Sequence, residues 1–156
     1  MVSDIMTLFS PERIQFVQEL ESKKRVFDTL AHLLSHKTNF SQNTIFDHLI
    51  EREKLGSTAL GKGVSLLRAR AQLTRPYAPL LLLTHGLSID SPDKQLTTVF
   101  IALLLPENEP QASTELIAEL ITRFTTRPIA NELAETSEAE IALNYLETLL
   151  QQPQLS

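Results

Sequence analysis

The sequence predicts one α/β domain, in which a central β-sheet has helices on both faces. Three observations predict it: helical spacing of apolar residues near the start, apolar runs of strand length in the middle, and helical spacing again in the last third. A sheet between two helical layers would bury all of these segments. The 156 residues, of which 42% are apolar, suffice for one core. We expect a single domain over residues 1–156, with its core in residues 14–150.

The first expected elements are a strand and two helices. Residues 14–20 alternate well enough for a short strand, with a helix as the alternative. A helix is expected over residues 22–36, with Ser22 as its N-cap, and another over residues 41–55, which Gly56 closes. The expected core positions are Val26, Phe27, Leu30, Leu33 and Leu34 in the first helix and Ile45, Phe46, Leu49 and Ile50 in the second.

The middle of the chain has the character of buried strands. A short run covers residues 63–69, and continuous aliphatic runs lie within residues 80–84 and 97–105. Runs that are apolar throughout fit strands buried on both faces. Residues 91–94 are Ser-Pro-Asp-Lys, with Pro at the second position, which predicts a β-turn between the last two strands.

Three helices are expected in the last third. Apolar spacing predicts one over residues 113–126, and a short one over residues 128–134 has Pro in its first turn. Ser137 and Glu140 have the spacing of a capping box, which would open a final helix. The core positions expected in that helix are Ile141, Tyr145, Leu146 and Leu149. The tail, residues 151–156, is expected to fray.

Charge and composition exclude several classes of function. The net charge of −5 disfavours a general nucleic-acid binder, because it repels phosphates. No apolar run approaches the about 20 residues that span a bilayer, and the first ten residues do not resemble a secretory signal. The absence of cysteine excludes disulfides and thiolate metal sites and suits the cytoplasm. His32 and His36 can share a helix face, but zinc needs three or four ligands, so we expect neither a metal nor a cofactor.

Three of the four glycines lie close together, at Gly56, Gly61 and Gly63. Glycine is needed where the backbone takes positive φ or another group comes close, so residues 56–63 are expected to form a shaped loop. They nearly match the phosphate-loop pattern G-x-x-x-x-G-K-[ST]. Gly63, however, replaces the magnesium-binding hydroxyl, and a helix precedes the loop where the motif needs a strand. We therefore favour a helix-to-strand connection over nucleotide binding.

Cationic side chains cluster after this loop. Arg68 and Arg70 are two apart on a predicted strand, so both point to the same face. Two guanidiniums on one face could hold a phosphate or carboxylate. Alternatively, they pair with carboxylates such as those of Glu51 and Glu53, which composition alone favours.

Two stretches around the loop resemble a known family signature. Residues 52–58 are Arg-Glu-Lys-Leu-Gly-Ser-Thr, and residues 61–64 are Gly-Lys-Gly-Val. They resemble the R-E-K-x-G-S-T-G-I-G-x-G-[IV] signature of the enzyme IIA domains of the bacterial phosphotransferase system. The resemblance is to the mannitol/fructose type and is closest to its nitrogen-regulatory branch. Residues 89–95 and 99–106 resemble a second segment of that family, and the resemblance extends over about residues 14–150.

The resemblance implies a mixed β-sheet with helices on both sides, the enzyme IIA fold of the mannitol/fructose type. It also implies a function: members accept a phosphoryl group on a histidine from the histidine phosphocarrier protein. Transport members pass it to a sugar-transporter domain. Nitrogen-regulatory members bind kinases, potassium transporters and other targets. The partners implied for this chain are the phosphocarrier protein, a sensor kinase or a transporter.

At the phosphorylated position the sequence departs from the family. The family motif ends in Pro-His, where this chain has Leu67 and Arg68, so Arg68 stands at the acceptor position. By a gapless count, Ser113 stands at the family's second active-site histidine. A guanidinium has no free lone pair with which to attack phosphorus. No catalytic residue is therefore expected at either place.

Other parts of the family's site remain. The matching residues are Arg52, which corresponds to the arginine beside the phosphorylated histidine, the loop hydroxyls Ser57 and Thr58, and the loop-shaping Gly56, Gly61 and Gly63. The candidate residues for binding an anion or a partner are therefore Arg52, Ser57, Thr58, Arg68 and Arg70.

Three functions are compatible with these residues. The favoured one is a regulatory protein that binds a protein partner and is not phosphorylated. The second is a working phosphocarrier that uses another residue, for which His85 is a candidate, so enzymatic activity stays open. The third is a sensor of a small phosphate-type anion. Neither nucleic-acid binding nor membrane insertion is expected.

Overall fold

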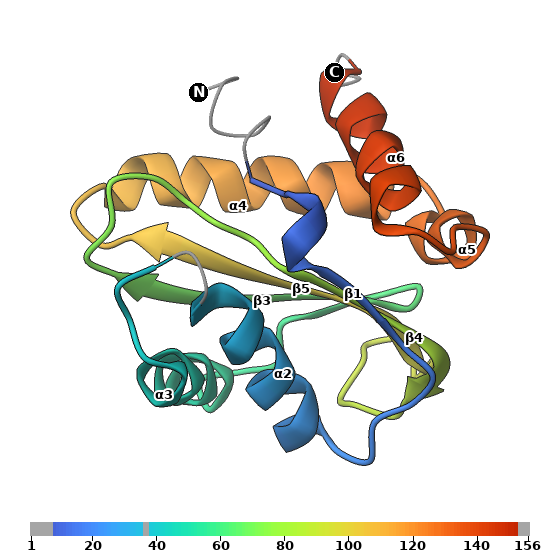
Figure 1. The fold of residues 1–156 in the computed structure, drawn as a ribbon, viewed down its shortest axis with the longest axis horizontal. Coiled ribbons are helices and arrows are strands. Elements are labelled where there is room, and N and C mark those ends of the chain that lie inside the picture. Colours follow the sequence, from blue (N-terminus) through green and yellow to red (C-terminus); the bar gives the residue numbers. More distant parts are fainter. Residues whose placement is uncertain (1–7, 36–37, 153–156) are drawn as a thin grey trace.

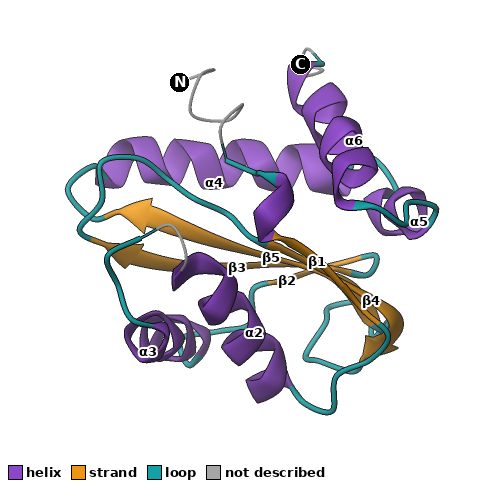
Figure 2. Cartoon of the chain, viewed as in Figure 1, coloured by secondary structure: helices purple, strands orange, loops and turns teal. Residues whose placement is uncertain are grey.

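The structure is a computed structural model that describes residues 8–35 and 38–152. Its strands are β1 (Ile14–Val17), β2 (Ala59–Gly61), β3 (Val64–Ala71), β4 (Leu80–Leu87) and β5 (Thr97–Pro106). They form one sheet, orange in Figure 2, and its strand order is β1-β4-β5-β3-β2. The pairs β1–β4 and β3–β5 are parallel, whereas β4–β5 and β2–β3 are antiparallel. The sheet is therefore mixed, as expected.

Helices cover both faces of this sheet (Figure 1). One face carries α2 (Lys23–Ser35) and α3 (Gln42–Glu53), and the other carries α4 (Pro110–Thr125), α5 (Ile129–Ala134) and α6 (Ala139–Gln151). A single turn of 3-10 helix, Pro11–Arg13, precedes β1. The predicted α/β class with two helical layers is confirmed, and residues 14–20 contain a strand rather than the alternative helix.

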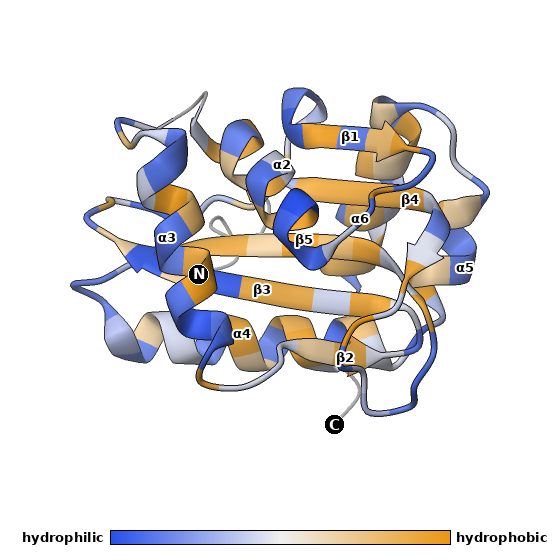
Figure 3. Cartoon of the chain, turned by 90° about the horizontal axis from the view of Figure 1, so that it is seen from below, coloured by the Kyte–Doolittle hydropathy of each residue, from blue (hydrophilic) through white to orange (hydrophobic). Residues whose placement is uncertain are grey.

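The central strand β5 shows why the layers form. Nearly all of its residues are buried (Figure 3, where the central strands are hydrophobic along most of their length). Phe100, Ala102 and Leu104 pack on the side of α2 and α3, whereas Ile101, Leu103 and Leu105 pack on the side of α4 to α6. Burying one such leucine or phenylalanine contributes about 1.5–3 kcal/mol, so an unbroken apolar strand is stable only between two covering layers.

Local signals position the helices near the site. Ser22 Oγ accepts a hydrogen bond from Arg25 N–H at 3.2 Å, and Ser41 Oγ accepts one from Thr44 N–H at 3.2 Å. Both satisfy donors that a helix start leaves without a partner. The predicted β-turn is confirmed as well, since Lys94 N–H donates to Ser91 O at 3.1 Å.

The glycine-rich segment contains a strand that the sequence analysis missed. β2 pairs with the start of β3, at Ser65 and Val64. A strand of three residues ending in Gly61 has too few apolar positions to show a period, and its pairing depends on a neighbour in space. The segment is thus a helix, a loop and a hairpin, which is the opposite order to the strand–loop–helix of a phosphate loop.

The final helix begins differently from the prediction. Its N-cap is Glu138, which makes no side-chain capping bond, so the capping box expected from Ser137 is wrong. Ile141 is 47% exposed rather than part of the core. Leu146 and Leu149 are buried as expected, and Ala142 and Leu150 complete the buried face.

The other helices of this part also differ in detail. α4 begins at Pro110, three residues earlier than predicted, and Pro128 is the N-cap of α5 rather than part of its first turn. Of the tail expected to fray, Gln151 ends α6, while residues 153–156 and also His36 lie outside the described residues. Within the described ranges, no helix is both long enough and apolar enough to cross a bilayer.

Candidate functional site

The second half of β3 borders a cleft between α3 and α4. Arg68 and Arg70 extend from the same face of β3 as Val64 and Leu66, which pack into the core on the α4 side. Arg52 enters from the last turn of α3. The cleft has a volume of about 470 Å³, and we call it the arginine cleft. Its lining residues are His48, Glu51, Arg52, Arg68, Ala69, Arg70, Leu105, Thr114 and Ile117.

The carboxylates expected to neutralise Arg68 and Arg70 have other partners. Glu53 pairs with Lys23 at 2.9 Å and accepts the Thr58 hydroxyl at 2.8 Å, and Glu51 pairs with Lys54 at 3.1 Å. Arg68 and Arg70 form no ion pair with any described residue. The pairing alternative is therefore not what the structure shows.

Arg68 is a partly buried cation without a counter-ion among the described residues. Its Nε is buried and has no hydrogen-bond partner there. Burial lowers the pKa of Arg68 from its ordinary value, and the nearby Arg52 guanidinium lowers it further, against a smaller opposite effect of Glu53. Arginine nevertheless stays charged at any physiological pH. An anion in the cleft would relieve both the desolvation and the repulsion.

Arg52 also holds the segment that follows α3. Its Nη1 donates to Gly56 O at 3.1 Å. Gly56 N–H donates in turn to Glu53 O at 3.1 Å. These bonds tie the loop to the end of α3, so Arg52 positions the loop while its guanidinium lines the cleft.

Ser57 and Thr58 lie outside the arginine cleft. Ser57 Oγ donates to Asp90 O at 2.7 Å, and Thr58, which is 2% exposed, donates to Glu53 Oε1 at 2.8 Å. The hydrogen-bond donors of both hydroxyls are therefore used within the loop, which they hold in place. The structure does not bring them to the three arginines.

The hairpin after the loop needs its glycines. Gly61 and Gly63 have φ of +88° and +84°, and a Cβ at Gly63 would lie 3.0 Å from the Cβ of Ala130. Lys62, between them, also has positive φ, and its N–H donates to Asp93 Oδ2 at 2.7 Å. The hairpin is thus fixed to the β-turn of residues 91–94.

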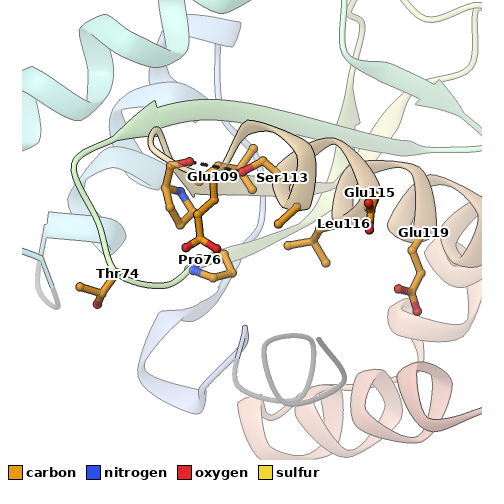
Figure 4. A pocket seen from close by; sticks show the side chains of 10 residues that line it. Thr74, Pro76, Glu109, Ser113, Glu115, Leu116 and Glu119 are labelled. Atoms are coloured by element: carbon orange, nitrogen blue, oxygen red, sulfur yellow. Dashed lines mark hydrogen bonds between the residues drawn. The ribbon is translucent and has the colours of Figure 1, made fainter.

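Ser113 faces a different cavity from the arginines (Figure 4). It is 3% exposed, its Oγ donates to Pro106 O at 3.3 Å, and the cavity it lines, of about 140 Å³, is bordered by Glu109 and Leu116. The residues of α4 that reach the arginine cleft are Thr114 and Ile117. A count along the sequence alone could not settle which side of α4 meets Arg68.

His48 is a site residue that was not expected from the sequence. Its Nδ1 lies 3.0 Å from Arg70 O, so it can donate to the edge of β3. His48 lies four residues before Arg52 on α3, and this spacing, which places both on one helix face, could have indicated it.

The other described histidines lie elsewhere. His85 is exposed on β4 and does not line the cleft, and His32 Nδ1 lies 3.3 Å from Gln42 Oε1. Among the described residues, no three histidine or acidic side chains form a group that could hold a metal ion.

Comparisons with known proteins agree with the fold. The model of a family described as "Phosphoenolpyruvate-dependent sugar phosphotransferase system, EIIA 2" matches residues 7–148. A nitrogen regulatory protein homolog of Haemophilus influenzae is 30% identical over 141 residues, which cover 87% of this chain and 86% of that protein.

Solved structures show the same architecture. The crystal structure of nitrogen regulatory protein IIA-Ntr from Neisseria meningitidis superposes with a TM-score of 0.78 at 26% identity and covers 94% of each chain. Enzyme IIA mannitol of Escherichia coli, in complex with phosphorylated enzyme IIB mannitol, has a TM-score of 0.70 at 16% identity, with 90% and 97% of the two chains covered. The latter likeness concerns the fold alone.

Proposed function

Because the chain belongs to the EIIA 2 family of the phosphoenolpyruvate-dependent sugar phosphotransferase system and is similar to nitrogen regulatory proteins, we propose that it regulates by binding a protein partner and is not phosphorylated at the family's acceptor position. We also propose that it acts in the cytoplasm as a single domain. The observation that carries the proposal is Arg68, a partly buried guanidinium in the arginine cleft with no counter-ion among the described residues.

Arg68 rules out the chemistry of the acceptor and changes the charge of the surface. A phosphoryl acceptor needs a free lone pair on nitrogen, which a guanidinium lacks. Phosphorylation adds between about 1.5 and 2 negative charges, whereas Arg68 adds a permanent positive charge at the same place. The charge of the cleft is therefore like that of an unphosphorylated family member, and phosphorylation does not change it. A partner would be bound regardless of the phosphorylation state of the cell.

The charges of the cleft indicate the chemistry of the partner. Arg52, Arg68 and Arg70 outnumber the one carboxylate that lines it, Glu51. The apolar side chains of Leu105 and Ile117 supply surface that a protein partner could cover. Proteins of this fold do form such complexes, as enzyme IIA mannitol does with phosphorylated enzyme IIB mannitol. We therefore propose a partner that presents an acidic surface, with the phosphocarrier protein, a sensor kinase or a transporter as candidates.

A small phosphate-type anion is the second candidate for the cleft. The buried Nε of Arg68 without a partner favours it, because charge-assisted hydrogen bonds to an oxyanion would satisfy such a donor. A working phosphocarrier that uses another residue is the remaining alternative.

Intact mass measurement after incubation with phosphoenolpyruvate, enzyme I and the histidine phosphocarrier protein tests the absence of phosphorylation. The wild type should gain no phosphoryl group, and its gain of one would overturn the proposal. The control is Leu67→Pro with Arg68→His, which restores the family motif. Phosphorylation of this double variant alone would show that docking is intact and that only the acceptor is missing.

Partner binding is tested with Arg68→Ala and Arg68→Glu against the phosphocarrier protein and against kinase and transporter domains. Arg68→Glu places a negative charge where phosphorylation would, so it should weaken binding more than Arg68→Ala. The binding role is falsified if both variants leave the affinity of every such partner unchanged.

A further inference from the structure

In the part of the chain that the structure describes, most of the outer edge of β3 has no neighbouring strand. In the described chain β2 pairs with β3 at Val64 and Ser65, and the last main-chain hydrogen bond on that side is Leu66 N–H donating to Thr58 O at 3.1 Å. β3 continues beyond this point to Ala71. Its inner edge is paired with β5 along its whole length. Beyond Leu66 the outer edge therefore has no strand beside it among the described residues.

The outward-facing peptide groups of this edge belong to the two arginines. On the inner edge, the peptide groups that face β5 belong to odd-numbered residues. Val99 N–H donates to Gly63 O at 3.0 Å, and Glu107 N–H donates to Ala71 O at 2.9 Å. Peptide groups alternate along a strand, so those of Arg68 and Arg70 face outward. Of these outward groups, Arg70 O is the one with a partner among the described residues, the ring of His48. The N–H groups of both arginines and Arg68 O have none in the described chain.

The arginine cleft gives access to this edge. α3 borders it with His48 and Arg52, and α4 borders it with Thr114 and Ile117. Its volume of about 470 Å³ lies in the range of sites that hold a drug-sized ligand. The space therefore suits several residues of an extended chain better than a single inorganic anion.

We infer that this edge receives an extended acidic segment of the partner protein, which adds as a strand outside β3 and sets carboxylates against Arg68 and Arg70. The inference rests on the proposed function and names the kind of segment that the partner contributes. Main-chain hydrogen bonds supply affinity in such a complex, and alternate side chains supply specificity. Every second side chain of an added strand faces the same side, so acidic residues two apart meet the two guanidiniums.

Charge selects this occupant over a second copy of the chain. Two β3 edges paired with each other would bring the arginines of both copies together, and like charges opposed across strands are destabilising. The chain as a whole carries a net charge of −5. An acidic segment is therefore repelled by the protein's overall charge and attracted by the arginine cleft, which directs it to this edge.

The test uses the full chain and a capped peptide of alternating Glu and Val, with Glu at both ends. NMR follows the backbone amides of Arg68 and Arg70, and calorimetry measures affinity. We expect saturable binding with a Kd at or below about 1 mM, together with slowed hydrogen exchange of the Arg68 amide. Arg68→Gln combined with Arg70→Gln should weaken binding at least tenfold, whereas Arg25→Gln, an exposed arginine on α2, should leave it unchanged.

Two methylated peptides separate strand addition from simple charge attraction. One is N-methylated at its Glu residues and the other at its Val residues, so both keep every charge. In an antiparallel strand the Glu N–H groups face β3, and in a parallel strand the Val N–H groups do. We expect one methylated peptide to bind at least tenfold more weakly than the unmethylated peptide, and the other to bind with unchanged affinity.

The remaining outcomes reject the inference. If both methylated peptides bind as tightly as the unmethylated peptide, or if no peptide binds, the inference of strand addition is wrong. If inorganic phosphate shifts the amide signals of Arg68 and Arg70, and the two methylated peptides bind with equal affinity, the cleft is a simple anion site. If Arg68→Glu still abolishes binding of the protein partner in that case, the proposed function stands and only the strand is rejected.

Discussion

Lys23 Nζ lies 2.9 Å from Glu53 Oε2, and this ion pair joins the start of α2 to the end of α3. It has a consequence for the arginine cleft, because Glu53 is a carboxylate whose charge reaches Arg68. With Lys23 and the Thr58 hydroxyl as its partners, Glu53 supports the scaffold and leaves the cleft cationic.

Lys23→Met should therefore destabilise the fold. The Glu53 side chain is only 9% exposed, so it would lose its cationic partner in a place that water reaches poorly, while Lys23 itself is more than a third exposed. We expect a loss of about 1 kcal/mol in the free energy of unfolding, measured by urea titration. Lys24→Met, at an exposed neighbouring position, is the matched control. An equal effect of both substitutions would contradict the role of the pair.

Thr58→Val should lower the stability of the fold without changing the affinity of the arginine cleft. The valine keeps the shape but removes the donor to Glu53 Oε1. We expect a loss of about 1–2 kcal/mol in stability. Affinity for anions or partners should not change, because Thr58 does not line the arginine cleft. A loss of affinity at unchanged stability would place Thr58 in the site after all.

Phosphate or a sugar phosphate should raise the melting temperature if the cleft holds an anion. A ligand that binds only the folded state stabilises it, and at ten times its Kd the expected shift is about 3–6 °C. Arg68→Gln should abolish the shift, whereas Arg25→Gln should keep it. A flat response of the wild type would remove the anion-sensor alternative and leave protein binding as the use of the cleft.

How far the sequence predicts this structure depends on the range of each interaction. Ser22 was predictable as a cap, because a cap depends on a residue three positions away. Strands β4 and β5 were predictable because their continuous apolar runs need a buried place in the core. β2 was not, since a strand of three residues is too short to show a period.

The site divides in the same way. Period two along a strand predicts that Arg68 and Arg70 share a face, and Arg52 came with the family resemblance. That Ile117 and Thr114 face them, and that Ser113 does not, depends on how α4 is rotated against the sheet. That Glu53 binds Lys23 instead of an arginine depends on how two helices dock. Neither can be read from spacing in one segment.

Gly63→Ala should strain the hairpin that carries β3. The residue has φ of +84°, which an alanine rarely adopts, and its Cβ would lie 3.0 Å from that of Ala130. We expect a loss of about 1–3 kcal/mol in stability by chemical denaturation. Adding Ala130→Gly removes the close contact but not the backbone strain. Full recovery in the double variant would mean that the contact alone mattered.

Asp93 should make stability depend on pH in the acid range. Its carboxylate accepts from Lys62 N–H, and also from the Ser91 hydroxyl and Gln95 N–H, and these bonds lower the pKa of Asp93 below its ordinary value. A group whose pKa is depressed in the folded state contributes stability above its unfolded pKa of about 3.9. That contribution is lost as the pH falls through the folded pKa, where the carboxylate takes up a proton.

Asp93→Asn isolates this effect. Both oxygens of Asp93 accept hydrogen bonds, and asparagine offers only one oxygen, so the variant should melt below the wild type at neutral pH. The difference in melting temperature should shrink as the pH is lowered through the acid range, because protonation then takes the same contribution from the wild type. Melting curves of both proteins from neutral pH downward give the comparison. A difference that stayed constant with pH would mean that shape rather than charge at this turn holds the β2–β3 hairpin in place.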